Sequence, residues 1–351
     1  MICTGLAVSA AAQPAAGKPE GGVVNTSAIV WNPVVKKVYA IDQRRSEVVV
    51  LDTKTGTERR VGVGAAPVSI AVNERSGRVY VANSSAGTVS VIDPLLDTVV
   101  ATVRVERRPY SIAVNSATGQ VYVTNTFSDK TSIIDGVTNT SSPLRTGAVD
   151  LIAIDSAANT IYLLSYESGT VTVLDGARLT MNRREGGKHA WGMAVDEALH
   201  TLYVARLGTG DVKALGQDAA EDTVIAAGKT TSSIAVNSKT HMVYASNYAS
   251  GDVTVIDGRT RRAVATVRAG ERPQALAVDE IRNLIFSDNT LGDSVTVIDG
   301  VTNQALATLP AGRRPYALAV EVGSSKLYVA NAVGEKMFRV VDTSGILGAR
   351  Q

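Results

Sequence analysis

The sequence predicts an all-β protein, an eight-bladed β-propeller of four-stranded antiparallel blades, on three observations. Val, Ile, Thr, Ser and Gly are abundant in the 351 residues, and they favour strands and turns over helices. A unit of about 41 residues recurs along the chain. Each unit holds short β-branched segments bounded by Asn, Asp or Gly, a pattern typical of the strands of a propeller blade.

Two independent markers count the units. One unit reads SIAVNERSGRVYVANSSAGTVSVIDPLLDTVVATVRVERRP, from Ser69 to Pro109. The polar residue that ends the first segment recurs at Asn32, Asn73, Asn115, Asp155, Asp196, Asn237, Asp279 and Glu321. The residue that ends the third segment recurs at Asp52, Asp93, Asp135, Asp175, Gly216, Asp257, Asp299 and Asp342. Both markers give eight units, with a seven-bladed ring and one detached unit as the alternative.

The strand segments also predict where each strand lies. VYVAN and VSVID lack polar–apolar alternation, which suits strands covered on both faces by neighbouring blades. SIAVN-type segments are expected to be innermost, and TVVATV-type segments outermost. One aromatic position in the second segment is expected to be buried between blades; its residues are Tyr80, Tyr122, Tyr162, Tyr203, Tyr244, Phe286 and Tyr328.

The turn after the third segment often contains Asp-Gly, as at Asp135-Gly136, Asp257-Gly258 and Asp299-Gly300. This dipeptide predicts a tight hairpin turn with positive φ, capped by the aspartate side chain. The aspartates are interpreted as scaffold rather than as a calcium site, because one per blade cannot converge on a single ion.

The N-terminal stretch MICTGLAVSAAAQPAAG resembles the end of a secretory signal with a small-residue cleavage site. Residues 1–22 are therefore predicted to be a signal-peptide remnant or a disordered tail, and residues 23–351 the propeller. A periplasmic or secreted location follows from this interpretation. The single cysteine, Cys3, allows no internal disulfide, and no apolar stretch has the length of a membrane span.

VYVTN at Val121–Asn125, VYVAN at Val79–Asn83 and LYVAN at Leu327–Asn331 resemble the signature of the 40-residue YVTN β-propeller repeat family. The resemblance covers residues 26–342, and it implies an extracytoplasmic bacterial or archaeal protein of poorly defined function. Three departures stand out: eight units where many relatives have seven blades, a degenerate fifth unit, and an eighth unit without a clear fourth segment.

The residues just before each first segment predict a basic ring around one channel mouth, because loops on a rigid scaffold usually carry function. The predicted ligand-binding residues are Arg107, Arg108, Tyr110, Lys188, His189, Trp191, Lys229, Arg272, Arg313, Arg314 and Tyr316. Arginine offers forked donors to carboxylate or phosphate, and Tyr or Trp offers a stacking surface. The structural alternative is that these are solvated loop charges that keep the ring soluble.

The predicted function is a non-catalytic binding or scaffold propeller for an anionic small molecule, polysaccharide or protein. The alternative is a lyase- or lactonase-like enzyme that uses His189 with Glu271 or Glu106 as the acid–base pair. No cofactor and no metal are predicted, because three histidines and two tryptophans do not supply haem, copper, iron or quinoprotein sites. The formal charge of +2 makes nucleic acid a weak third possibility.

Overall fold

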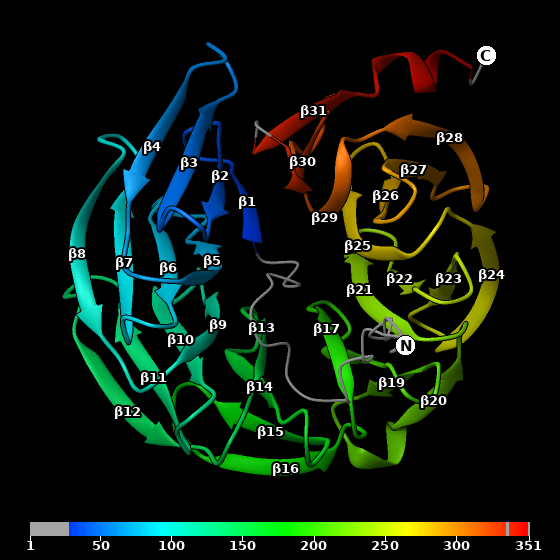
Figure 1. Cartoon of the computed structure of the whole chain (residues 1–351). Coiled ribbons are helices and arrows are strands. Elements are labelled where there is room, and N and C mark those ends of the chain that lie inside the picture. Colours follow the sequence, from blue (N-terminus) through cyan, green and yellow to red (C-terminus); the bar gives the residue numbers. More distant parts are fainter. Residues whose placement is uncertain (1–27, 335–336, 350–351) are drawn as a thin grey trace, which may run out of the picture.

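The computed structural model describes residues 28–334 and 337–349, which form a ring of eight sheets around a central channel (Figure 1). Within these residues, seven sheets have four antiparallel strands and the eighth has three. The predicted eight-bladed propeller is therefore confirmed, and the seven-bladed alternative is wrong. The predictions for residues 1–22 lie outside the described residues.

The strands follow one another outward from the channel in every blade (Figure 1). The first strands are β1 (Ile29–Asn32), β5 (Pro67–Val72), β9 (Pro109–Val114), β13 (Leu151–Asp155), β17 (Ala190–Asp196), β21 (Thr231–Asn237), β25 (Pro273–Asp279) and β29 (Arg313–Val320). The second strands are β2 (Lys37–Asp42), β6 (Val79–Asn83), β10 (Gln120–Asn125), β14 (Thr160–Leu164), β18 (Thr201–Arg206), β22 (Met242–Asn247), β26 (Leu284–Asn289) and β30 (Lys326–Val333). The SIAVN-type strands are innermost, as predicted.

The third and fourth strands complete the blades. The third strands are β3 (Glu47–Asp52), β7 (Thr88–Asp93), β11 (Lys130–Asp135), β15 (Thr170–Asp175), β19 (Asp211–Leu215), β23 (Asp252–Asp257), β27 (Ser294–Asp299) and β31 (Phe338–Asp342). The fourth strands are β4 (Glu58–Gly62), β8 (Thr98–Arg104), β12 (Ser141–Arg145), β16 (Met181–Glu185), β20 (Thr223–Ala226), β24 (Arg262–Arg268) and β28 (Gln304–Pro310). Two short 3₁₀ segments, η2 (Ala219–Glu221) and η3 (Ser344–Ala349), follow β19 and β31. The fifth blade is complete despite its irregular sequence.

The core lies between the blades. All the aromatic residues predicted to be buried in the second strands are buried, and Tyr39 of the first blade occupies the same position. Tyr80, for example, packs with Ile112 and Val121 of the next blade. Such side chains remove large apolar areas from water, so each blade is stabilised mainly by its neighbours.

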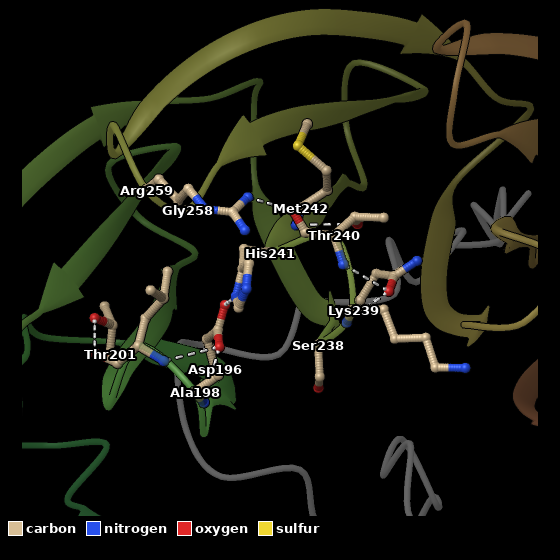
Figure 2. A network of polar contacts seen from close by, with 12 residues as sticks. Asp196, Ala198, Thr201, Ser238, Lys239, Thr240, His241, Met242, Gly258 and Arg259 are labelled. Atoms are coloured by element: carbon tan, nitrogen blue, oxygen red, sulfur yellow. Dashed lines mark hydrogen bonds and ion pairs between the residues drawn. The ribbon is translucent and has the colours of Figure 1, made fainter.

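Side chains at the ends of the first strands link successive blades at the face opposite the candidate mouth. Asp196 Oδ1 accepts hydrogen bonds from Ala198 and Leu199 in its own turn, while Oδ2 lies 2.8 Å from His241 Nδ1 of the next blade (Figure 2). The same position elsewhere gives the pairs Asn32–Gly77, Asn115–Asn159, Asp155–His200 and Asn237–Asn283. Where the first-strand residue is aspartate, whose carboxylate can only accept, its partner is histidine, which can donate. Where it is asparagine, its amide nitrogen donates to an oxygen of the next blade.

The predicted Asp-Gly hairpin geometry is wrong, although the predicted aspartate caps are present. Asp135 Oδ1 accepts hydrogen bonds from Val137 and Thr138, but the positive φ of 57° is at Asn139, and Gly136 is not among the positive-φ residues. A Cβ on Gly136 would lie 2.4 Å from the Gly119 carbonyl oxygen. Glycine is required there for close approach between two turns rather than for a left-handed backbone.

The ring closes by side-chain packing between the eighth and first blades. Trp31 of β1 stacks on Tyr328 of β30, with ring centroids 6.4 Å apart and an interplanar angle of 4°. Lys326 also donates a hydrogen bond from Nζ to the Thr53 carbonyl. Within the described part of the chain, no strand is shared between these two blades.

Candidate functional site

The loops that enter the first strands share one face with the loops that leave the second strands. Arg108 and Arg272 have left-handed backbones, with φ of 53° and 60°. Their carbonyls accept hydrogen bonds from Thr126 and Thr290, each just after a second strand of the same blade. The left-handed turn thus ties the two loops together at the channel mouth. Arg314, with φ of 52°, has the same conformation.

A cavity of about 900 Å³ opens at this mouth, on the side formed by the first blade and blades five to eight. Trp191, Tyr248 and Tyr316 supply aromatic surface, while Arg314 and Arg44 are among its cationic residues. Gln274, Thr290 and Asn331 add neutral hydrogen-bonding groups. The cavity therefore combines positive charge with flat apolar surfaces, in the size range of roughly 300–1,000 Å³ found for small-molecule sites.

Only some of the predicted site residues line this cavity. Trp191, Arg314 and Tyr316 are in its wall. Arg272 lies beside it, because its guanidinium carbon is 4.8 Å from the ring centroid of Tyr248, which is itself a lining residue. Lys229 is exposed and immediately precedes Thr230 of the cavity wall.

Other predicted residues lie elsewhere on the same face. Arg107 and Arg108 are exposed in the loop before β9, outside the cavity wall, and Arg108 lies over Phe127, 5.3 Å from its ring centroid. Arg313 lines a different cavity, between the eighth and first blades.

The two predicted tyrosines are neutral wall residues. Burial raises the pKa of Tyr316 to about 12, and burial with the nearby Asp150 carboxylate raises the pKa of Tyr110 to about 12. Both phenols therefore stay protonated at neutral pH. Tyr110 is half-buried and is not in the cavity wall, whereas Tyr316 is buried within it. Each can donate a hydrogen bond but adds no charge.

His189 and Trp191 pack against the buried ring of Tyr166. Its centroid is 5.3 Å from that of His189 and 5.8 Å from that of Trp191, the latter in an edge-on arrangement. Lys188 is exposed and His189 is partly exposed. Within the described residues, neither Glu271 nor Glu106 hydrogen bonds to His189, and Glu106 instead pairs with Lys130 at 3.5 Å. The arrangement supplies no acid–base pair for the enzymatic alternative.

The mouth cations have no acidic partners among the described residues. None of the ion pairs found there includes Arg107, Arg108, Lys188, Lys229, Arg272, Arg313 or Arg314. Other basic residues are paired, such as Arg60 with Glu47 and Lys37 with Asp97. The charges of these seven cations are therefore not offset by ion pairs with described acids, although Asp42 is in the cavity wall and Asp293 accepts a hydrogen bond from the Arg314 amide.

Three glutamates lie at the face opposite the mouth. Glu197 and Glu280 directly follow the first strands β17 and β25. Glu74 lies two residues after β5. The pKa of Glu74 is raised above its ordinary value, first by burial and then by repulsion from Glu197 and Glu280. Glu197 and Glu280 are thus close enough to Glu74 to repel it electrostatically.

Sequence reasoning missed part of the cavity wall. Arg44 and Arg45 precede β3, and Tyr248 follows β22, so all three lie in loops after second strands. The signal was available, because these loops recur with the same period as the loops before the first strands. The aromatic residues Phe127, Tyr166 and Tyr248 each follow a second strand by one or two positions.

Among the described residues, no group of three or more His, Cys, Asp or Glu side chains is arranged to hold a metal ion. None of the helices in that part of the chain is long and apolar enough to cross a membrane.

Comparison with solved structures supports the fold. The dihydro-haem d1 dehydrogenase NirN in complex with DHE has a TM-score of 0.75 and 14% identity, over 90% of this chain and 72% of that chain. Kuenenia stuttgartiensis hydrazine synthase has a TM-score of 0.62 and 14% identity, over 93% of this chain and 98% of that chain. No protein-family model and no curated protein matches the sequence. The likeness to the YVTN family therefore stays a resemblance.

Proposed function

We propose that this protein is an extracytoplasmic, non-catalytic binding or scaffold propeller whose basic mouth holds an anionic partner. The observation that carries the proposal is the set of mouth cations without acidic partners among the described residues. Unpaired arginines beside aromatic surfaces suit carboxylate, sulfate or phosphate groups. An anionic ligand would supply the missing counter-charge.

The shape of the cavity favours a partner that presents a flat or extended anionic part. Trp191 and Tyr248 come from the fifth and sixth blades, while Arg314 and Tyr316 come from the eighth. One structural neighbour is named for dihydro-haem d1 and was solved in complex with DHE. Haem-type rings are flat and carry carboxylates, so a soluble porphyrin polycarboxylate is a suitable first probe. An oligouronate represents the polymeric anions.

The test uses uroporphyrin and oligoguluronate as probes and a triple variant of the mouth, Arg108→Asn, Arg272→Asn and Arg314→Asn. Asparagine is chosen because it tolerates the left-handed backbone of these positions better than most residues. The matched control carries Arg104→Asn, Arg183→Asn and Arg262→Asn, which changes the same charge on exposed outer strands. Affinities are measured by titration calorimetry or fluorescence at low and high salt.

We expect the mouth variant to bind at least one probe about tenfold or more weakly at low salt, with the control unchanged. The difference should shrink as salt screens the charges. Equal affinities of both triple variants would contradict the proposal, as would the absence of binding to either probe by the unchanged protein.

A further inference from the structure

The eighth blade is one strand shorter than the others within the described residues. In every other blade a fourth strand covers the third, whereas β31 is the outermost described strand of its blade, and a cavity of about 650 Å³ lies beside it, between the eighth and first blades. Phe338 and Val340 of β31 line one side, and Leu51 and Glu58 of the first blade line the other. Figure 1 shows the eighth blade, which ends at β31, next to the first blade in the ring.

The outer edge of β31 presents unpaired backbone groups. In the third blade the amide of Asp135, which corresponds to Asp342, donates outward to the Thr140 carbonyl. In the eighth blade the amide of Thr343 donates inward, to Ser325. Strand amides alternate in direction, so those of Asp342, Val340 and Phe338 face the open side. A sheet edge of this kind is a template for an additional strand.

The complete blades define what such a strand needs. In each of three fourth strands an aliphatic residue lies opposite the same third-strand position, in the pairs Val89–Val103, Val253–Val267 and Val295–Leu309. Val103 and Val267 are only 5% exposed. Phe338 occupies the corresponding third-strand position in the eighth blade. An added strand therefore needs one aliphatic side chain opposite Phe338.

Charge around the cavity further limits the partner. Arg313, Lys326 and Arg339 line it, against Asp52 and Glu58. The Asp52 carboxylate already accepts hydrogen bonds from two amides of its own turn, which lowers its pKa. Asp52 therefore stays ionised, and the cavity has three cations against two carboxylates. This excess of one positive charge favours acidic residues beside the aliphatic one.

By repeat spacing, the residues before β1 correspond to a fourth strand, but their sequence is not that of a strand. In the other blades the fourth strand ends a few residues before the next first strand. The corresponding residues before β1, at positions 17–22, read GKPEGG. Glycine and proline are poor strand formers, and this stretch has no aliphatic residue.

We propose that the edge of β31 binds an extended segment of a partner polypeptide, which pairs antiparallel to β31 and completes the eighth blade. The segment carries an aliphatic residue opposite Phe338 and acidic residues at its ends. Main-chain hydrogen bonds supply affinity, and the aliphatic and acidic groups supply specificity. The cavity beside β31 adjoins the mouth cavity, with which it shares Asn331 and Gly334. The triple mouth variant leaves Arg313 and β31 unchanged, so the two tests can fail separately.

The experiment uses a fluorescent peptide with the sequence of Gln304–Pro310 (QALATLP) and an aspartate added at each end. The decisive variant is Val340→Pro, which removes an outward amide and leaves the ladder with β30 intact. The control is Val340→Thr, which keeps the amide and a β-branched side chain at a position that is 47% exposed. Thermal unfolding and circular dichroism check that both variants fold, and Arg313→Glu provides a second variant away from the strand backbone.

We expect the peptide to bind the unchanged protein and Val340→Thr equally, and Val340→Pro about tenfold or more weakly. Arg313→Glu should weaken binding of the acidic peptide but not of one with lysine ends. Equal binding to Val340→Pro and Val340→Thr would overturn the proposal, and so would no binding at all. Two results would assign the edge differently and also overturn it: a concentration-dependent dimer abolished by Val340→Pro, or binding seen only after residues 1–22 are deleted.

Discussion

His241 of the sixth blade hydrogen bonds through Nδ1 to Oδ2 of Asp196 in the fifth blade, at 2.8 Å (Figure 2). The Asp196 side chain is fully buried, and the His241 side chain is 13% exposed. Two of the three histidines serve such links, because His200 makes the same contact with Asp155. These histidines are therefore accounted for by the scaffold.

Replacing His241 with alanine should lower the free energy of unfolding by about 2–3 kcal/mol, because a buried carboxylate oxygen loses its donor. The double variant Asp196→Asn with His241→Asn imitates the Asn237–Asn283 pair of the next junction. It should recover at least about 1 kcal/mol of the loss in urea unfolding. A double variant as unstable as His241→Ala would show that the loss comes from packing alone.

Asp288 is expected to make the stability fall as the pH rises. It is fully buried in β26, where Oδ1 accepts hydrogen bonds from the amides of Gln274 and Ala275 while Oδ2 has no partner among the described residues. Burial raises its pKa from 3.8 to about 7. The folded state therefore holds this proton more tightly than the unfolded state, and stability is lost between about pH 4 and pH 7.

The substitution Asp288→Asn should remove this loss and stabilise the protein at pH 8 by up to about 4 kcal/mol. Exposed Asp135 provides a control of opposite sign, because backbone hydrogen bonds lower its pKa and its contribution is lost as the pH falls. Urea unfolding of both asparagine variants between pH 4 and pH 8 distinguishes them. A pH profile of Asp288→Asn that matches the unchanged protein would rule out this assignment.

Equivalent tyrosines in adjacent blades offer a matched pair. The Tyr203 hydroxyl donates to the Gly258 carbonyl at 3.2 Å, whereas the buried Tyr244 hydroxyl has no partner among the described residues. Tyr203→Phe should therefore cost about 0.5–1.5 kcal/mol, and Tyr244→Phe should be neutral or stabilising. Alanine at either position should cost about 3–5 kcal/mol, since both rings are fully buried. Chemical unfolding compares the four variants, and similar effects of the two Phe substitutions would contradict the hydrogen-bond assignment.

The repeat made the blade count, the strand order and the buried aromatic position predictable from the sequence, because each depends on spacing alone. The His–Asp links also had a signal, since His200 and His241 are one 41-residue repeat apart, as are Asp155 and Asp196. His200 and His241 thus occupy the same position in successive repeats, although histidine is rare in the chain.

The candidate site was less predictable, because side-chain direction depends on backbone details that spacing does not contain. Arg313 and Arg314 are neighbours in sequence, yet they line different cavities. The left-handed backbone of Arg108, Arg272 and Arg314 is equally invisible in the sequence, where arginine gives no indication of positive φ. The repeat was enough to predict which loops form the mouth, but not which of their side chains line the cavity.

Closure through the Trp31–Tyr328 stack has a mechanical consequence. Tension applied through the first and last blades falls on one junction, where apolar side chains and the hydrogen bond of Lys326 to Thr53 hold the described parts together. This seam should open at a lower force than any blade unravels, because separating packed side chains does not require a ladder of strand hydrogen bonds to break. A strand bound along β31 would sit beside the seam and brace it, so the same ring would resist pulling more strongly when its eighth blade is complete.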